Sequence, residues 1–327
     1  MSDARVAVTF EPPGAGRASI DEVLAPLAEL TYLQELGSEG RRDALRSADA
    51  VLAWFISSEL SADELRLLDD VKLLQLYSAG ADRVPFERLP PGLRVAANAG
   101  AYSEPMAEHV LAMALALAKR LPQNHAAMAR GEFDQQTPNR GVRGATLGVL
   151  GFGGIGQAAA RLFRAVGVRV HAINRSGTTD EPVDWIGTLD DLDSLLDAAD
   201  VLVVSLPLTR ATRGLIGGRE LRAMKPDAIL VNVARVAIVD EDALYEHLRA
   251  NASFSAGIDA WWQEPREGDT FTTAHPFLEL PNVIGSPHNS ALTSESLTVA
   301  AQRAAENIAR ELRGEPVAHV VDRADYA

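Results

Sequence analysis

Three side chains with complementary chemistry stand in the second half of the chain, each just after an apolar run. They are Arg235, Glu264 and His288. An arginine offers a planar fork of donors that suits a carboxylate, a histidine exchanges protons near neutral pH, and a neighbouring carboxylate favours the charged imidazolium. Loops at the carboxyl ends of parallel strands converge on a ligand crevice. We therefore expect these residues at one sheet edge, where they could do acid–base chemistry.

A glycine-rich turn lies near the middle of the chain, at residues 151–156, where the sequence reads Gly-Phe-Gly-Gly-Ile-Gly. The apolar run 145–150 predicts a buried strand before it, and residues 157–166 predict a helix after it. A strand, Gly-x-Gly-x-x-Gly and a helix form the start of a dinucleotide-binding fold, with the helix N-terminus at the phosphates. A turn with only a structural role is the alternative, and the flanking elements disfavour it. The predicted phosphate-binding residues are Gly151, Gly153, Gly154, Ile155 and Gly156.

The residues after the next predicted strand indicate which cofactor binds. In this fold an acidic residue at that point binds the adenine ribose hydroxyls. Here the predicted strand 168–173 is followed by Asn174, Arg175 and Ser176, with no carboxylate. A 2′-phosphate would be repelled by an aspartate but bound by an arginine and hydroxyl groups. We expect NADP rather than NAD as the cofactor; a solvated surface arginine is the alternative.

Strand-like and helical segments alternate along most of the chain, as is typical of parallel sheets with crossover helices. Ser61 is a candidate N-cap for a helix over 61–69, and Ser103 is one for a strongly apolar helix from 103 to about 121. Residues 131–144 predict a loop or arm. The predicted strands cover residues 5–10, 50–55, 73–77, 93–97, 145–150, 168–173, 201–206, 229–233, 255–258 and 283–285, and a last helix covers 294–313.

This alternation predicts an α/β fold with two doubly wound parallel-sheet domains. A length of 327 residues fits two domains. We expect a Rossmann-type dinucleotide-binding domain at residues 101–290. It would be inserted in a flavodoxin-like substrate domain made of residues 1–100 and 291–327.

The composition excludes several classes of function. The formal net charge of −14 argues against nucleic acid and anionic membranes as partners. The chain has no cysteine, which excludes disulfides and thiolate chemistry, and its histidines lack metal-ligand spacing, so we expect no metal. No apolar run is long enough to span a bilayer, and no signal peptide is apparent. A cytoplasmic enzyme is the expectation.

Four motifs follow the glycine turn in order. They are Asn-x-Ala-Arg at 232–235, Val-Asp-Glu-x-Ala-Leu at 239–244, Asp259 with Glu264-Pro265 downstream, and Pro287-His288. With these motifs the chain resembles the D-isomer-specific 2-hydroxyacid dehydrogenases, over roughly residues 70 to 295. Further runs that fit this family are Ala-Gly-Ala-Asp at 79–82, Ala-Glu-His at 107–109, and Ser-Leu-Pro-Leu-Thr at 205–209 with Thr212.

The resemblance implies a role for each site residue. Arg235 would hold the carboxylate of a 2-oxo acid and polarise its oxo group. His288, paired with Glu264, would protonate the carbonyl oxygen as hydride arrives at C2, or remove that proton in oxidation. Asp259 would face the nicotinamide. A homodimer formed through the cofactor domain and the arm 131–144 is also implied. The implied carboxylate-binding amides belong to Ser78, Ala79 and Gly80, and the remaining implied cofactor contacts are Leu206, Pro207, Thr212, Val233 and Ala234.

Some residues depart from the family pattern or extend it. Val236 stands where glycine is common, so the arginine loop is either extended or differently shaped at that point. Trp54 and Phe55 are candidates for the substrate pocket and predict a larger or more apolar 2-oxo acid than glyoxylate. His109 is an expected interdomain contact. The alternatives are a formate or phosphite dehydrogenase-like enzyme, which the ordinary Glu264 disfavours, and a nucleotide-sensing, corepressor-like binding protein, which the acidic charge disfavours.

Overall fold

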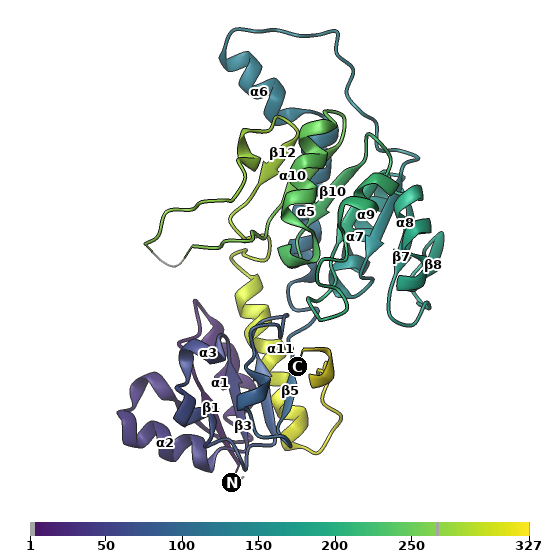
Figure 1. The fold of residues 1–327 in the computed structure, drawn as a ribbon. Helices are drawn as coiled ribbons and strands as arrows, with labels where there is room; N and C mark the ends of the chain where they lie inside the picture. Colours follow the sequence, from purple (N-terminus) through teal and green to yellow (C-terminus); the bar gives the residue numbers. More distant parts are fainter. Residues whose placement is uncertain (1–3, 266–267, 327) are drawn as a thin grey trace. The chain divides into compact units, whose positions relative to one another are not determined.

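Two compact units make up the fold (Figure 1). The computed structural model describes residues 4–265 and 268–326. One unit comprises Met1–Tyr102 and Leu292–Ala327, and we refer to it as the terminal unit. The other comprises Ser103–Ala291 and is the central unit. Each is built on a parallel sheet flanked by helices, which confirms the predicted fold class.

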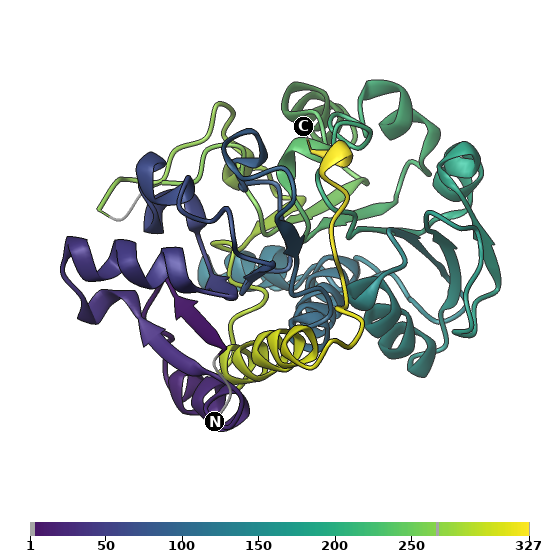
Figure 2. The ribbon, with the colours of Figure 1, turned by 90° about the horizontal axis from the view of Figure 1, so that it is seen from below.

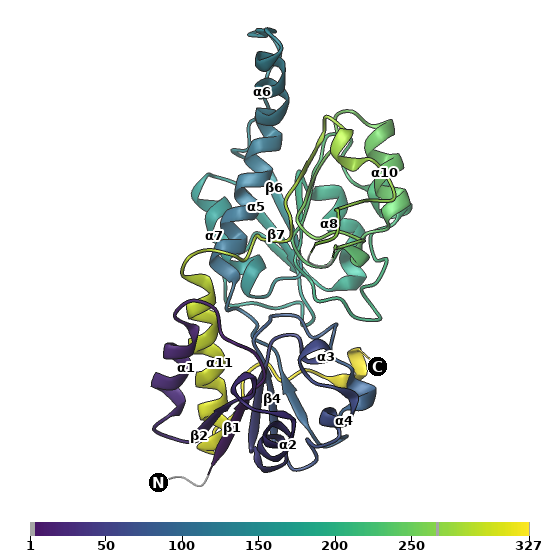
Figure 3. The same ribbon diagram turned by 90° about the vertical axis from the view of Figure 1, so that its left-hand side faces the viewer.

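The terminal unit holds a five-stranded parallel sheet. Its strands are β1 (Arg5–Val8), β2 (Glu29–Tyr32), β3 (Ala50–Ala53), β4 (Leu73–Leu76) and β5 (Arg94–Ala96). Its helices are α1 (Gly16–Leu24), α2 (Ser38–Ser47), α3 (Ile56–Glu59), α4 (Ala62–Leu65) and α11 (Ser296–Leu312). The strand order β2-β1-β3-β4-β5 is that of flavodoxin-like sheets. Helices α1 and α11 pack together on one face, and α2, α3 and α4 lie on the other (Figure 3).

Small side chains let α11 approach α1 closely. Ala300, Ala301, Ala304 and Ala305 are buried along one face of α11. A Cβ built on Gly16 of α1 would lie only 3.4 Å from the Cβ of Ala301. After α11, residues 319–321 return beside β5 through backbone hydrogen bonds (Figure 2). Both ends of the chain therefore contribute to this unit.

The central unit holds a seven-stranded parallel sheet. Its strands are β6 (Thr146–Leu150), β7 (Arg169–Ile173), β8 (Trp185–Gly187), β9 (Val201–Val204), β10 (Ile229–Asn232), β11 (Ser255–Ile258) and β12 (Val283–Gly285). Its helices are α5 (Ser103–Ala118), α6 (Leu121–Ala129), α7 (Gly154–Ala165), α8 (Leu192–Ala198), α9 (Gly218–Ala223) and α10 (Glu241–Ala250). The strand order is β8-β7-β6-β9-β10-β11-β12. This is the Rossmann order 3-2-1-4-5-6 with a seventh strand added.

The long apolar helix α5 packs against β10, β11, β12 and α7. Met113 fills the space above Gly257 of β11, where a Cβ would lie 2.9 Å from the methionine sulfur. The helix begins at Ser103 itself, and the buried Ser103 hydroxyl makes no hydrogen bond within the described residues. The predicted N-cap role of Ser103 is therefore wrong.

Helix α5 ends at Ala118, before the predicted end, because the backbone turns there. Arg120 adopts a left-handed conformation with φ of 51°, and α6 starts immediately after it. Helix α6 and the following segment extend away from the sheet of the central unit (Figures 1 and 3). Residues 131–144 contain neither helix nor strand, as predicted.

The remaining differences concern short elements. The sequence pattern does not predict β2 and β8, which are edge strands of four and three residues. Ser61 does cap a helix, with a capping box to Glu64, but α4 covers only Ala62–Leu65 rather than 61–69. The last helix is two residues shorter at its start than the predicted 294–313 and one shorter at its end.

Candidate active site

The glycine turn brings the end of β6 against the loop after β9. Gly151 has φ of 106°, and a Cβ there would lie 2.6 Å from the backbone nitrogen of Leu206, so only glycine fits. A Cβ on Gly156 would lie 2.5 Å from the carbonyl oxygen of Gly151. By contrast, Gly153 is exposed, and nothing lies within 4 Å of a Cβ built there. The turn therefore requires glycine at positions 151 and 156, whereas the space beside Gly153 is open.

Helix α7 begins directly at this turn, with Gly153 as its N-cap residue. No side chain from the described residues caps its first amides, so N–H groups and the positive end of the helix dipole face an incoming anion. β6 lies between β7 and β9, where the strand order reverses. Ligands bind at such a switch point in doubly wound sheets. Turn, helix and sheet together fit the pyrophosphate of a dinucleotide.

The loop after β7 is closed by its own hydrogen bonds. The Oδ1 atom of Asn174 accepts from the backbone nitrogens of Ser176 and Gly177 at 3.1 and 2.7 Å. Its Nδ2 atom donates to the carbonyl oxygen of Thr178 at 2.7 Å. Arg175, Ser176 and Thr178 are exposed. Asn174 therefore shapes the loop, while an arginine and two hydroxyl groups face solvent at the carboxyl end of β7.

The loop after β9 carries the next set of predicted cofactor contacts. Leu206 is half-buried and Pro207 is exposed. Thr212 is buried, and its hydroxyl donates to the carbonyl oxygen of Pro207 at 2.8 Å and accepts from Thr209 N at 2.8 Å. The side chain of Thr212 thus shapes the loop from inside. After β10, the predicted contacts Val233 and Ala234 are likewise buried.

His288 and Glu264 are in direct contact. The Nδ1 atom of His288 lies 2.5 Å from Oε1 of Glu264, and both side chains are partly exposed, at 33% and 26%. A carboxylate that accepts the Nδ1 hydrogen fixes the ring and leaves Nε2 for proton transfer. His288 has φ of 52°, a left-handed conformation uncommon outside glycine. Two of the three predicted catalytic side chains are therefore brought together.

Asp259 directly follows β11 and is fully buried. Its Oδ1 and Oδ2 atoms accept from the backbone nitrogens of Asn289 and Ser290, both at 3.2 Å. Its carbonyl oxygen accepts from the nitrogen of His288 at 2.9 Å. The predicted contact of Asp259 with the nicotinamide stays a prediction. In this structure the carboxylate instead binds the loop that carries His288.

Arg235 follows β10 and is half-buried. The side chain of Asn232 shapes its loop, because Oδ1 accepts from Ala234 N at 3.1 Å and Nδ2 donates to the carbonyl oxygen of Arg235 at 3.4 Å. The Nη1 atom of Arg235 donates to the carbonyl oxygen of Ala234 at 3.1 Å. Val236 opens a short 3₁₀ turn, and its backbone is not left-handed, so this loop does not need glycine there.

An aromatic cluster lies in the terminal unit where β1, β3 and β4 end. Trp54 stacks on Phe55 with ring centroids 5.2 Å apart and an interplanar angle of 14°. The Trp54 ring also lies 5.7 Å from Phe10 and 5.0 Å from Tyr77. Phe55 is 46% exposed, and the neighbouring residues 78–80 are half-buried. The cluster offers an apolar surface next to the predicted carboxylate-binding amides.

The carboxylate of Glu59 fixes the backbone of this cluster. Its Oε2 atom accepts from Trp54 N at 3.0 Å and from Thr9 Oγ1 at 2.6 Å. Its Oε1 atom accepts from Phe55 N at 2.6 Å. Sequence reasoning missed Glu59, because nothing in a run of exposed polar residues distinguishes a carboxylate that binds backbone amides.

Two further polar residues near His288 were also missed as site residues. The Nε2 atom of His109, on α5, lies 2.9 Å from Oγ of Ser286, and that hydroxyl donates to Oδ1 of Asp259 at 2.5 Å. His109 therefore has a partner within the central unit, and its expected role as an interdomain contact stays a prediction. The position of Ser286, two residues before His288, was the available signal.

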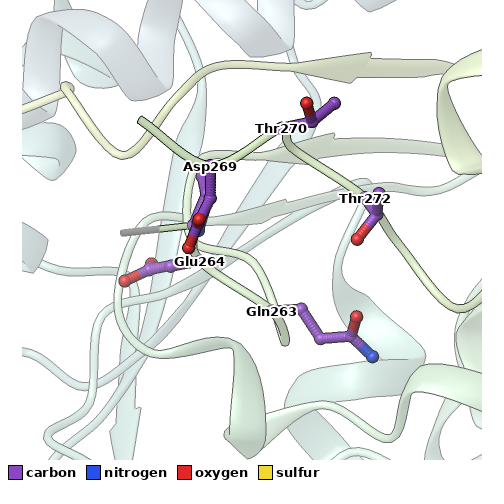
Figure 4. Close-up of a pocket in the computed structure, with 6 residues that line it drawn as sticks. Gln263, Glu264, Asp269, Thr270 and Thr272 are labelled. Carbon is purple, nitrogen blue, oxygen red and sulfur yellow. The ribbon is translucent and has the colours of Figure 1, made fainter. Parts of the chain in front are cut away.

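A hollow of about 350 Å³ borders one side of Glu264 (Figure 4). Neither His288 nor Arg235 lines it. Residues 4–265 and 268–326 contain no group of three or more histidines and carboxylates that could hold a metal ion. No helix in these residues has the length and apolar character needed to cross a membrane. The hollow is lined by Gln263, Glu264, Pro265, Asp269, Thr270 and Thr272.

Comparison with known proteins assigns the family. Residues 111–290 match the NAD-binding domain of D-isomer specific 2-hydroxyacid dehydrogenases, which is more than half of the chain. The chain belongs to the D-isomer-specific 2-hydroxyacid dehydrogenase family. This match confirms the family predicted from the motifs, and two relatives of which the chain spans 86% and 82% are named glyoxylate reductase and hydroxypyruvate reductase.

Individual relatives span several activities. The D-3-phosphoglycerate dehydrogenase of Methanocaldococcus jannaschii is 32% identical over 92% of this chain, which spans a little over half of that relative (57%). The glyoxylate reductase of Aeropyrum pernix is 32% identical over 85% of this chain and 84% of its own. A solved structure from Pyrobaculum aerophilum, provisionally named a formate dehydrogenase, has a TM-score of 0.82 and 28% identity over 98% of this chain and 99% of its own.

Proposed function

We propose that this chain reduces 2-oxo acids to D-2-hydroxy acids with NADPH and catalyses the reverse oxidation. The observation that carries the proposal is the 2.5 Å contact between His288 Nδ1 and Glu264 Oε1. It lies at the sheet edge that also presents Arg235, since β10, β11 and β12 are neighbours. A 2-oxo acid has a carboxylate for an arginine and, on the next carbon, a carbonyl oxygen for a proton donor.

The proposed steps divide among three side chains. Arg235 binds the substrate carboxylate and stabilises the negative charge that develops on the 2-oxo oxygen. His288 donates the proton on Nε2 to that oxygen in reduction and removes it in oxidation. Glu264 holds Nδ1, so that Nε2 keeps its direction. A bound nicotinamide cofactor supplies or accepts the hydride at C2.

Formate oxidation is the second candidate, favoured by the similarity to the Pyrobaculum aerophilum structure. Removing hydride from formate gives carbon dioxide and requires no proton transfer to or from the substrate. An imidazole held by a carboxylate can therefore donate the proton that 2-oxo acid reduction requires, whereas formate oxidation requires no such donor. A 2-oxo acid therefore suits this pair of side chains better than formate does.

The cofactor proposal rests on the loop after β7. The side chain of Asn174 closes this loop by hydrogen bonds to the backbone of residues 177 and 178, and Arg175, Ser176 and Thr178 are exposed at the strand end. No carboxylate follows β7 directly, so the 2′-phosphate of NADPH meets donors rather than a like charge. We assign Arg175 as the main 2′-phosphate ligand.

The substrate proposal rests on the aromatic cluster. Trp54 and Phe55 stack beside residues 78–80 and are held by Glu59, which gives a fixed apolar wall. Such a wall stabilises a substrate with an apolar side chain in proportion to the area it buries. We therefore place 2-oxoisocaproate and phenylpyruvate ahead of glyoxylate, although relatives are named glyoxylate reductases.

The oligomer proposal rests on α6 and the arm 131–144. Leu121, Met128 and Phe133 are 57%, 61% and 73% exposed. Large apolar side chains gathered on a projecting segment mark an interaction surface. The proposed occupant is the same segment of a second copy, as the family resemblance implies.

The variant His288→Gln is expected to lower kcat for 2-oxo acid reduction by about 10²- to 10⁴-fold, because the proton donor is lost. NADPH affinity should be retained, since the glycine turn is untouched. The measurement is loss of NADPH absorbance with glyoxylate, hydroxypyruvate, pyruvate, 2-oxoisocaproate and phenylpyruvate. His125→Gln, an exposed histidine on α6, is the matched control. Wild-type kcat in His288→Gln contradicts the assignment, and turnover of formate alone supports the second candidate.

The variant Arg175→Ala is expected to lower kcat/KM for NADPH by roughly 10- to 100-fold, the worth of a charge-assisted hydrogen bond. The value for NADH should not change, because NADH lacks the 2′-phosphate. Steady-state kinetics with both cofactors measure the ratio. Arg249→Ala removes a 63% exposed arginine on α10 and serves as the control. Equal losses with the two cofactors would count against the 2′-phosphate contact.

The variant Trp54→Ala is expected to lower kcat/KM for phenylpyruvate by about 10- to 100-fold relative to glyoxylate, because the apolar wall loses its largest ring. Trp54→Phe keeps an aromatic ring and should keep most of the preference. The ratio of the two kcat/KM values is the measured quantity. An unchanged ratio in Trp54→Ala would remove Trp54 from the pocket.

The variant Phe133→Asp is expected to shift the chain from dimer toward monomer, because a charge replaces an apolar contact in the arm. Sedimentation equilibrium measures the mass in solution. Gln135→Asp adds the same charge at an exposed polar position of the arm and should keep the dimer. A monomeric wild-type chain, or a Phe133→Asp dimer of wild-type strength, contradicts the proposal.

A further inference from the structure

A hydrogen-bonded chain of three side chains runs behind the loop of His288, and the proposed steps do not use it. It starts at His109 on α5, passes through Ser286 after β12, and ends on Asp259 after β11. The two links measure 2.9 and 2.5 Å. All three residues belong to the central unit. Helix α5 is thereby connected to the loop that carries the candidate proton donor.

The chemistry of the three side chains determines which atom donates and which accepts in each hydrogen bond. A carboxylate only accepts, and a serine hydroxyl has one hydrogen to give. Because Oγ of Ser286 donates to Oδ1 of Asp259, it accepts from His109, so Nε2 of His109 carries a hydrogen. The link therefore depends on one tautomer of His109 and one rotamer of Ser286. The donor and acceptor roles in the two hydrogen bonds therefore cannot be reversed.

Asp259, the last residue of this hydrogen-bonded series, binds the backbone next to a residue in a strained conformation. Asp259 has no exposed surface, and its two oxygens also accept from the nitrogens of Asn289 and Ser290. Between these contacts, His288 has φ of 52° and donates its own nitrogen to the Asp259 carbonyl oxygen. A non-glycine residue in this region is strained and persists only when its surroundings hold it. Asp259 holds both sides of the strained residue.

A fully buried carboxylate is stable only when its oxygens are hydrogen-bonded. The Ser286 hydroxyl supplies the shortest bond to Asp259, at 2.5 Å, and it is the one side-chain hydroxyl among the hydrogen bonds described above for this carboxylate. His109 orients that hydroxyl from the opposite side. Nε2 of His109 also lies 3.9 Å from Oδ1 of Asp259, too far for a direct bond. Ser286 is thus the element that connects them.

We propose that Ser286 and His109 are positioning residues for the proton transfer, which hold the Asp259 carboxylate and through it the backbone of His288. The inference rests on the proposed role of His288 as the acid/base. Neither residue is assigned a contact with substrate or cofactor. Their effect is to keep Nδ1 of His288 on Glu264 and Nε2 in a constant direction. A displacement of about 1 Å in such a group costs roughly 10²-fold in rate.

The test compares variants that keep or lose the hydroxyl and the ring donor. Ser286→Ala is expected to lower kcat by about 10- to 100-fold when it is assayed at a temperature at which the variant is fully folded. Ser286→Thr keeps the hydroxyl and should restore kcat. His109→Phe should lower kcat in the same direction, whereas His109→Gln retains an N–H donor and should lose little. Ser194→Ala, exposed on α8, is the control.

A second readout does not depend on turnover. The hydrogen between His288 Nδ1 and Glu264 should give a far-downfield proton NMR signal, identified by its loss in His288→Gln. Ser286→Ala is expected to shift or broaden this signal, and Ser286→Thr to retain it. If no 2-oxo acid is reduced while the signal still responds, the proposed function fails and the positioning role stands. Wild-type kcat and an unmoved signal in Ser286→Ala overturn the positioning role, as does a loss of kcat that merely follows a lower unfolding temperature.

Discussion

The candidate site depends on the register of three parallel strands, whose carboxyl ends lie side by side. β10, β11 and β12 pair so that Asn232, Ile258 and Gly285 stand side by side. Each strand is followed within three residues by Arg235, Asp259 or His288. A slip of one residue in this pairing would shift the three residues relative to one another along the sheet edge. The close fit of Met113 on Gly257 holds α5 against this register.

The fold could be predicted where local sequence decides burial. β6 and β9 are buried at every residue, so their apolar runs are visible, and the glycine turn between β6 and α7 leaves few alternatives. The edge strands β2 and β8 are short and partly exposed, and therefore lack such a run. Helix ends were less predictable, because a single left-handed residue, Arg120, separates α5 from α6 and nothing in its type announces it.

The candidate site was likewise predictable from the sequence only in part. Residue type and position after a strand were enough to single out Arg235, Glu264 and His288, and the contact between the last two follows from the fold. Residues that act through another residue were not found. Glu59 binds backbone amides of a neighbouring turn, and His109 is 177 positions from its partner. Such pairings exist only in the folded chain, so no local pattern reveals them.

The use of both chain ends in the terminal unit has a consequence for biosynthesis. The face of its sheet that α11 covers stays open until residues 296–312 have left the ribosome, after about 190 intervening residues have been made over roughly 10 to 40 s. The central unit is one continuous segment and completes its sheet within that interval. Vectorial synthesis thus lets the dinucleotide-binding unit complete its sheet first, and leaves the five-stranded sheet with an apolar face that α1 covers only in part until α11 arrives.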